Sequence, residues 1–128
     1  MRVMVFGVFD GLHEGHRYFL MEALRQAQGD LVVVVAHDET VRQLKHKTPK
    51  FGELERVEAI RKVLPQASVV LGDQQQGSYN VVKTHRPAMI CLGYDQRELG
   101  DDLRRSMREG SIPMLPLYEI SRHNVSKL

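Results

Sequence analysis

The sequence predicts an α/β protein with an open, mainly parallel sheet of five strands and helices on both faces. Short apolar runs alternate with longer segments of helical character along the chain, as in repeated strand–helix–strand units. In addition, residues 31–36 hold four valines and a leucine without polar alternation, which is typical of a parallel strand covered on both faces. We expect one domain over residues 1–128, because a domain takes roughly 150 residues.

The first half of the chain is predicted to form two strands and three helices. Residues 3–6 are a short apolar run with β-branched content, and residues 15–28 repeat apolar side chains at helical spacing. After the buried strand at 31–36, a short helix over 38–45 begins at an aspartate that can cap it. A basic loop, HKTPKFG, then leads to a helix over 53–64. The predicted apolar face of this helix consists of Leu54, Val57, Ile60, Val63 and Leu64.

The second half is predicted to add three strands and two helices, which cover, in order, 68–71, 79–85, 88–92, 97–109 and 112–118. Gly110 ends the charged helix before the fifth strand. Pro113 and Pro116 confine that strand to an edge of the sheet, because proline lacks the N–H that a central strand donates. The tail, ISRHNVSKL, is predicted to begin a further helix.

Charge and composition exclude several classes of protein. The formal net charge of +2 is too small for a general nucleic-acid binder, so an anionic ligand must be met locally. No apolar run approaches the ~20 residues that span a bilayer, and Gly7 and Asp10 interrupt the first run before it resembles a secretory signal. Cys91 is the single cysteine, which excludes an internal disulfide. We therefore expect a cytoplasmic protein without nucleic-acid or membrane partners.

Polar segments follow the predicted strands, at the edge where open α/β sheets bind ligands. They are GVFDGLHEGH, HDET, GDQQQGS, GYDQ and Glu119-Ile120-Ser121. The first places His13 and His16 on a strand-to-helix turn, where the N–H groups of a helix start attract anions. Gly15 leaves room for a ligand, and Gly7 and Gly11 permit the tight turn.

The histidine pair has one favoured and two alternative interpretations. Two imidazoles can donate hydrogen bonds to phosphoryl oxygens, and phosphoryl transfer depends on such positioning without a protein nucleophile. A helix cap or a surface position is the structural alternative, which the glycine-rich turn makes less favoured. Zinc is the other alternative, but metal pairs on a helix prefer i, i+4 spacing with further ligands, and this pair has i, i+3 spacing.

The segment GVFDGLHEGH resembles the first signature of the HxGH nucleotidyltransferases, the cytidylyltransferase-like family with a Rossmann-like sheet. The resemblance implies transfer of a nucleoside monophosphate from ATP or CTP to an acceptor phosphate, with pyrophosphate leaving. It implies Mg²⁺ as cofactor, held mainly by the triphosphate and not by protein ligands. It also implies that His13 and His16 stabilise the transition state at the α-phosphorus. The predicted nucleotide-binding residues are Gly7, Val8, Phe9, Asp10, Gly15, Gly93, Asp95, Ser121 and Arg122.

Two further segments, VAHDETV and GYDQ, resemble the stand-alone archaeal-type FAD synthases, which adenylylate FMN. The resemblance therefore implies ATP as donor and FMN as acceptor. A CTP-dependent cytidylyltransferase acting on glycerol 3-phosphate or a related phosphate ester is the main alternative. A nucleotide-binding module without turnover is a third. The family also implies a homodimer.

The basic loop and its neighbours supply further candidates. Lys45 and Lys47 match the place where relatives supply a lysine to the β- and γ-phosphates, and a solvated connector is the alternative. We assign Lys45 to catalysis, and Lys47 and Arg56 to acceptor binding, with a surface salt bridge as the alternative for Arg56. Asp10 is assigned to orienting the acceptor or metal, or else to capping the first helix. Asp95 either binds nucleotide or shapes a turn.

The sequence also departs from the family pattern. Val8 stands where relatives commonly have threonine, and the late serine- and threonine-rich motif keeps only Ser121. We interpret Arg122 or His123 as a cationic replacement for the missing hydroxyls.

Overall fold

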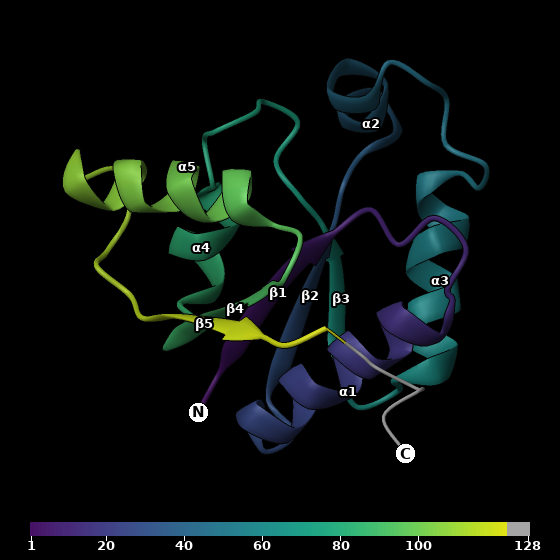
Figure 1. Ribbon diagram of the computed structural model, residues 1–128, viewed down its shortest axis with the longest axis horizontal. Helices are drawn as coiled ribbons and strands as arrows, with labels where there is room; N and C mark the ends of the chain where they lie inside the picture. Colours follow the sequence, from purple (N-terminus) through teal and green to yellow (C-terminus); the bar gives the residue numbers. More distant parts are fainter. Residues whose placement is uncertain (123–128) are drawn as a thin grey trace.

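The computed structural model describes residues 1–122 and contains a five-stranded sheet (Figure 1). The strands are β1 (Val3–Gly7), β2 (Leu31–Val35), β3 (Ser68–Leu71), β4 (Met89–Gly93) and β5 (Leu117–Ile120). Their order is β3-β2-β1-β4-β5, and every neighbouring pair is parallel. The predicted α/β architecture is therefore confirmed.

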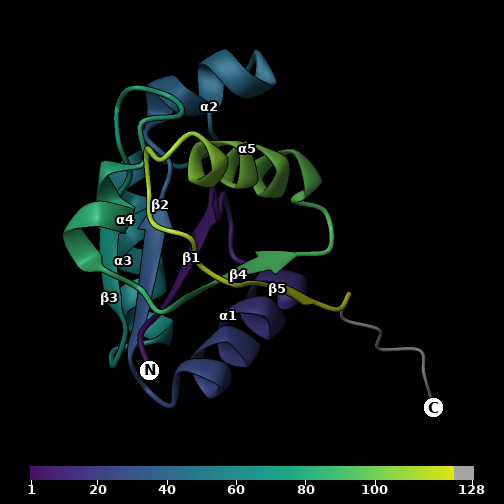
Figure 2. The ribbon, with the colours of Figure 1, turned by 90° about the vertical axis from the view of Figure 1, so that its left-hand side faces the viewer.

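Helices connect the strands and cover both faces of the sheet. They are α1 (Glu14–Ala27), α2 (Asp38–Lys45), α3 (Glu53–Val63), α4 (Asn80–His85) and α5 (Arg97–Arg108). Helices α1 and α3 contribute buried residues to one core, and α4 and α5 contribute to the other. Helix α2 lies beyond the ends of the strands (Figure 2). None of the helices within residues 1–122 combines the length and the apolar character needed to cross a bilayer.

Alternate side chains of each strand enter the two cores. Val5 packs in the core with Leu20 of α1 and Ile60 of α3, whereas Met4 packs in the core with Leu103 of α5. Every residue of β2 is buried, as its run of valines predicts. Burial of one such side chain contributes about 1.5–3 kcal/mol relative to exposure, so these two cores fix the sheet between its helices.

Several local predictions were wrong. Residues 112–116 lie outside the fifth strand, which begins only after both prolines because proline cannot donate to the ladder; its edge position is confirmed. Leu54 is 70% exposed and does not face the core. Asp38 is the first helical residue of α2, and the N-cap is His37. The predicted tail helix begins with Ile120, which belongs to β5; its part beyond Arg122, with His123, lies outside the described residues.

Candidate active site

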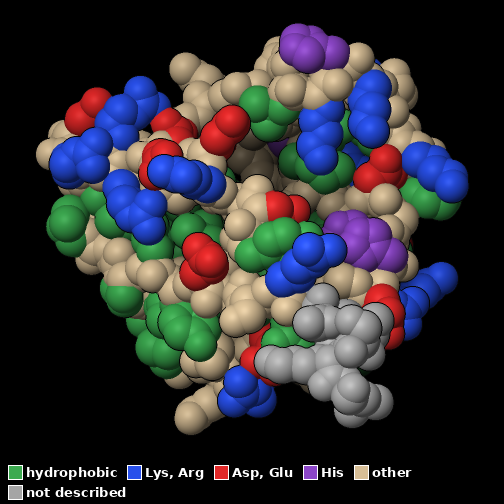
Figure 3. All heavy atoms as spheres, viewed as in Figure 1, with side chains coloured by type: hydrophobic (Ala, Val, Ile, Leu, Met, Phe, Trp, Pro, Cys, Tyr) green, Lys and Arg blue, Asp and Glu red, His purple; other side chains and the backbone are tan. Residues whose placement is uncertain are grey.

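A crevice opens where the strand order changes direction, between β1 and β4. β1 pairs with β2 along its whole length, but with β4 only at Val3 and Met4. The two strands therefore part toward their carboxyl ends, which is where open α/β sheets bind ligands. Figure 3 shows the molecule hollowed between α5 and α2.

Gln96 bridges the two strands where they part. Its side-chain Nε2 donates to the carbonyl of Phe6 at 2.8 Å, and its Oε1 accepts the N–H of Gly93 at 2.8 Å. One amide thus satisfies a carbonyl of β1 and an N–H of β4 beyond the end of their ladder. Gln96 was not among the predicted site residues. The sequence feature that could have identified Gln96 is its side-chain amide at the end of GYDQ, directly after a strand.

His13 and His16 open α1 and stack against each other. Their ring centroids lie 3.7 Å apart, with the ring planes 17° from parallel. His13 is also the N-cap, because its Nδ1 accepts the N–H groups of Gly15 at 3.1 Å and His16 at 3.3 Å. A neutral imidazole that accepts at Nδ1 carries its proton on Nε2, on the far side of the ring. His13 therefore occupies the N–H groups expected to meet an anion and offers Nε2–H in their place.

Two glycines make room for rings within this turn. A Cβ on Gly15 would lie 3.0 Å from Cε1 of His13, so the space predicted for a ligand adjoins the His13 ring. A Cβ on Gly7 would lie 2.5 Å from the ring of Phe9. Phe9 has a left-handed backbone with φ 54°, and its buried ring meets His16 edge-on, with centroids 5.6 Å apart. Only the backbone of Phe9 is therefore suited to the predicted nucleotide contact.

The surroundings of His16 lower its pKa. Burial is the main cause, because it disfavours the charged ring, and repulsion by His13 is the next. A hydrogen bond with the backbone of Gly11 and the charge of Asp95 act in the opposite direction, and Lys45 adds to the lowering. The structure thus brings Asp95 and Lys45 into electrostatic range of the paired imidazoles.

The carboxylate of Asp10 binds two backbone N–H groups. Oδ2 accepts from Lys50 at 2.7 Å, and Oδ1 accepts from Phe51 at 2.8 Å. Burial raises the pKa of Asp10, but these hydrogen bonds and the charges of Arg56 and Lys47 outweigh it, so the pKa lies below its usual value. The alternative that Asp10 caps α1 was wrong, because the N-cap is His13.

Arg56 lies in the interior, with a side chain that is 0% exposed. Its Nε donates to Phe51 O at 2.9 Å, and its Nη1 donates to Val8 O at 2.8 Å and Ala36 O at 2.9 Å. Its Nη2 donates to Asp38 Oδ1 at 2.7 Å. A guanidinium enclosed in this way does not contact the acceptor substrate, and it does not form a salt bridge on the surface. Both predictions for Arg56 therefore fail, and the residue ties β1, β2 and the basic loop together.

Lys45 and Lys47 lie beside the segment from Gly7 to His16, which we call the histidine turn. Lys45 is the last residue of α2, and Lys47 is the second residue of the basic loop; both are exposed. His46 between them has φ 56°, which turns the chain away from the helix axis. Lys45 interacts electrostatically with His16, and Lys47 with Asp10. The basic loop therefore borders the predicted triphosphate site.

The last predicted residues follow β4 and β5, which pair through Gly93 and Ile120. A Cβ on Gly93 would lie 3.0 Å from Oδ1 of Asp95, so glycine allows this carboxylate to fold back over the strand end. The guanidinium carbon of Arg122 lies 5.7 Å from the ring centroid of Tyr94. Ser121, beside Arg122, is exposed. These residues share the carboxyl edge of the sheet with the histidine turn.

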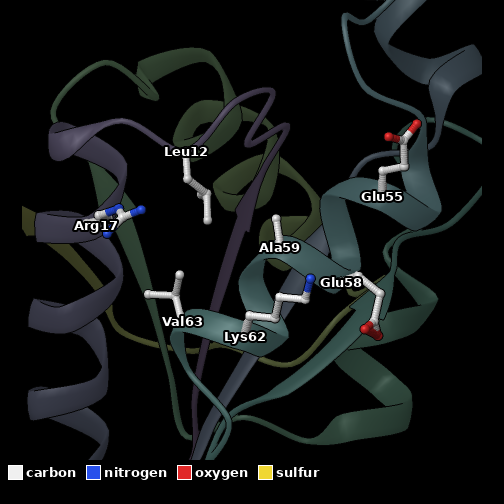
Figure 4. Close-up of a pocket in the computed structure, with 7 residues that line it drawn as sticks. All are labelled: Leu12, Arg17, Glu55, Glu58, Ala59, Lys62 and Val63. Atoms are coloured by element: carbon white, nitrogen blue, oxygen red, sulfur yellow. The ribbon is translucent and has the colours of Figure 1, made fainter.

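A separate cavity of about 480 Å³ opens between α1 and α3 (Figure 4). Its lining combines apolar side chains with both signs of charge, and consists of Leu12, Arg17, Glu55, Glu58, Ala59, Lys62 and Val63. None of the predicted site residues is among them. The candidate active site is therefore the crevice between β1 and β4, where the imidazoles, lysines and strand ends meet.

The family model described as cytidylyltransferase-like matches residues 4–109, most of the described chain. The chain belongs to the cytidylyltransferase-like family. It is accordingly a nucleotidyltransferase, with the histidine turn, the basic loop and the β1–β4 crevice all inside the matched region.

Several proteins are similar to this chain over most of their own length. The FAD synthase of Pyrococcus abyssi is 38% identical over 100% of this chain and 89% of its own. The FAD synthase of Aciduliprofundum boonei is 43% identical over 88% of this chain and 73% of its own. A crystal structure of the lipopolysaccharide core biosynthesis protein from Thermoplasma volcanium has a TM-score of 0.82 and 35% identity, covering 97% of this chain and 98% of that one.

Proposed function

We propose that this member of the cytidylyltransferase-like family is an FAD synthase, which transfers AMP from ATP to FMN and releases pyrophosphate. The proposal is supported by the FAD synthases that align with it, among them one that is 38% identical along the whole chain. The observation that carries it is the stacked pair of imidazoles at the start of α1, beside the crevice between β1 and β4.

In the proposed reaction, a phosphate oxygen of FMN forms a bond to the α-phosphorus of ATP. The bond from that phosphorus to the bridging oxygen of the β-phosphate breaks, and pyrophosphate leaves. His13, through Nε2–H, and His16 would stabilise charge on the oxygens of the α-phosphate. Lys45 would neutralise the β- and γ-phosphates. We propose that Lys47, two residues along the chain, also meets the triphosphate, in addition to its predicted role in acceptor binding. No protein nucleophile is needed.

The remaining predicted residues would border the nucleotide. The backbone of the turn from Gly7 to Gly15 forms one side of the crevice, and Gly93 and Asp95 form the other. Arg122 lies over Tyr94 at the same edge, where it could meet a phosphate in place of the missing hydroxyls.

Mg²⁺ fits this site as an ion that arrives with the nucleotide. Within residues 1–122, no three or more His, Cys, Asp or Glu side chains are grouped as ligands of a metal ion. Mg²⁺ usually keeps several waters and binds through substrate phosphates with few protein carboxylates. We therefore propose that the triphosphate supplies most of its ligands, and that the ion neutralises phosphate charge.

Incubation with Mg²⁺, ATP and FMN tests the proposed function. We expect FAD and pyrophosphate in equal amounts, separated and quantified by chromatography. Turnover of another phosphate ester without any FAD would reject the assignment.

A CTP-dependent cytidylyltransferase acting on glycerol 3-phosphate or a related ester is the second candidate. The description of the matching family as cytidylyltransferase-like favours it. Parallel assays with CTP and glycerol 3-phosphate distinguish the two enzymes. In a nucleotide-binding module without turnover, the nucleotide would raise the melting temperature of the protein, and no pyrophosphate would be released. We further propose a homodimer, which sedimentation of the purified protein would test. We also propose a cytoplasmic location, which fractionation of cells would test.

A further inference from the structure

Hydrogen bonds connect the C-terminal end of the basic loop to the histidine turn. Both oxygens of Asp10 accept loop N–H groups, those of Lys50 at 2.7 Å and Phe51 at 2.8 Å, across 40 and 41 residues of sequence. The Phe51 ring also packs close to the turn, since a Cβ on Gly11 would lie 3.5 Å from it. By contrast, the three residues from His46 to Thr48 are exposed.

Arg56 makes a second tie between the same two segments. It donates to Phe51 O in the loop and to Val8 O in the turn, at 2.9 and 2.8 Å. The loop end therefore has hydrogen bonds on both its N–H and its C=O side. Hydrogen bonds with one charged partner are stronger than those between neutral groups, and the bonds of both Asp10 and Arg56 are of this kind.

We infer that Asp10 is a positioning residue, whose carboxylate holds the basic loop against the histidine turn and thereby sets where Lys47 meets the polyphosphate. This inference rests on the proposed function for the identity of the nucleotide. Both carboxylate oxygens of Asp10 accept hydrogen bonds from the loop, so we infer that Asp10 acts on the substrate through Lys47. The negative charge of Asp10 also attracts the ammonium of Lys47.

Asp73 offers a matched control for this role. Its carboxylate also accepts two backbone N–H groups, those of Asn80 at 2.7 Å and Val81 at 3.1 Å, at the start of α4. Asp73→Asn therefore removes the same kind of bond at another place. It tests whether the effect of Asp10→Asn is specific to the lysine loop.

Amide hydrogen exchange tests the connection itself. Asp10→Asn keeps one acceptor oxygen and Asp10→Ala keeps none, so exchange at the amides of Lys50 and Phe51 should rise from wild type to Asn to Ala. Asp73→Asn should leave exchange at these two amides unchanged. Unchanged exchange in both Asp10 variants would overturn the inference.

ATP affinity, measured by calorimetry with Mg²⁺, tests the consequence for Lys47. We expect Asp10→Asn and Lys47→Ala each to weaken binding about fivefold or more, and the double variant to bind within about twofold of the weaker single variant. Asp73→Asn alone should instead change ATP affinity by less than about twofold. Multiplying effects for Asp10 and Lys47, or unchanged affinity in Lys47→Ala, would overturn the inference.

Two further arms keep the outcome clear. If Asp10→Asn does not fold, Asp10→Glu takes its place in the exchange and ATP-binding experiments. This substitution keeps the charge and shifts the oxygens by one methylene. ATP binding and hydrogen exchange do not require FMN. Wild-type protein that binds ATP but forms no FAD would therefore reject the proposed function and still test the role of Asp10.

Discussion

His13 and His16 share one helix start, where the ring of each accepts the backbone N–H of the other. Nδ1 of His13 accepts the N–H of His16 at 3.3 Å, and the two rings stack with centroids 3.7 Å apart. At this distance a positive charge on His13 opposes protonation of His16 and so lowers the pKa of His16. His13 is thus both a structural cap and a source of an Nε2–H donor, and the two roles can be separated by substitution.

His13→Asn should keep the cap but draw the side-chain donor back from the position of Nε2, because the amide is shorter than the imidazole. Asparagine is among the best N-cap residues, so we expect the free energy of unfolding to stay within about 0.5 kcal/mol of wild type. Loss of one donor to the reacting phosphate should lower kcat about 10²–10³-fold. Urea unfolding and FAD formation measure the two effects.

His13→Ala is the comparison, because it removes the cap as well as the donor. It should lose a similar amount of activity and in addition about 1 kcal/mol of stability. If asparagine destabilised the protein as much as alanine, the cap observed in the structure would not explain the role of His13.

Protonation of His16 should destabilise the fold below neutral pH. Its pKa in the folded protein lies below the ordinary 6.5, so well above pH 6.5 the ring is neutral in both the folded and the unfolded chain. As the pH falls below 6.5, the unfolded chain takes up a proton that the folded protein resists, and stability decreases until the folded pKa is passed. Urea unfolding at about pH 7.5 and about pH 5 measures this decrease, which should be smaller in His16→Asn. Parallel pH curves for both proteins would contradict it.

Local patterns in the sequence predicted most of the fold. The valines of β2 need no distant partner to be recognised, because a strand without polar residues must be covered on both faces. The glycine-rich turn at His13 and His16 follows directly on β1, so its place at the edge of the sheet follows from chain order alone. The prolines predicted an edge strand but not its start, because their missing N–H groups also exclude residues 112–116 from the ladder.

Residues with distant partners could not be assigned in this way. Arg56 reaches Val8, 48 residues away, and Gln96 reaches Phe6, 90 residues away. Their acceptors are backbone carbonyls, which no residue type reveals. Leu54 fits the helical period of the α3 face, yet it is 70% exposed, because periodicity does not show how wide the covered face is.

Gln96→Leu should weaken the connection between β1 and β4. Leucine has a similar size but leaves Phe6 O and Gly93 N without the amide. Each unpaired buried group costs about 1–3 kcal/mol, and because Gln96 is half-buried we expect a total near the low end of this range. The KM for ATP should rise, since the strand ends border the crevice. Gln66→Leu, at an exposed position, should change stability by less than about 0.5 kcal/mol.

Arg56→Lys should destabilise the protein strongly although it conserves charge. A single ammonium cannot replace a planar fork that reaches four oxygens, including the carboxylate of Asp38. Breaking a buried ionic network of this kind costs about 3–5 kcal/mol, measured by chemical denaturation. Arg42→Lys is the matched control, because Arg42 pairs with Glu39 on the surface, where such pairs contribute at most about 1 kcal/mol. Equal denaturation midpoints for the two variants would mean that the enclosed guanidinium does not hold the turn, β2 and the loop together.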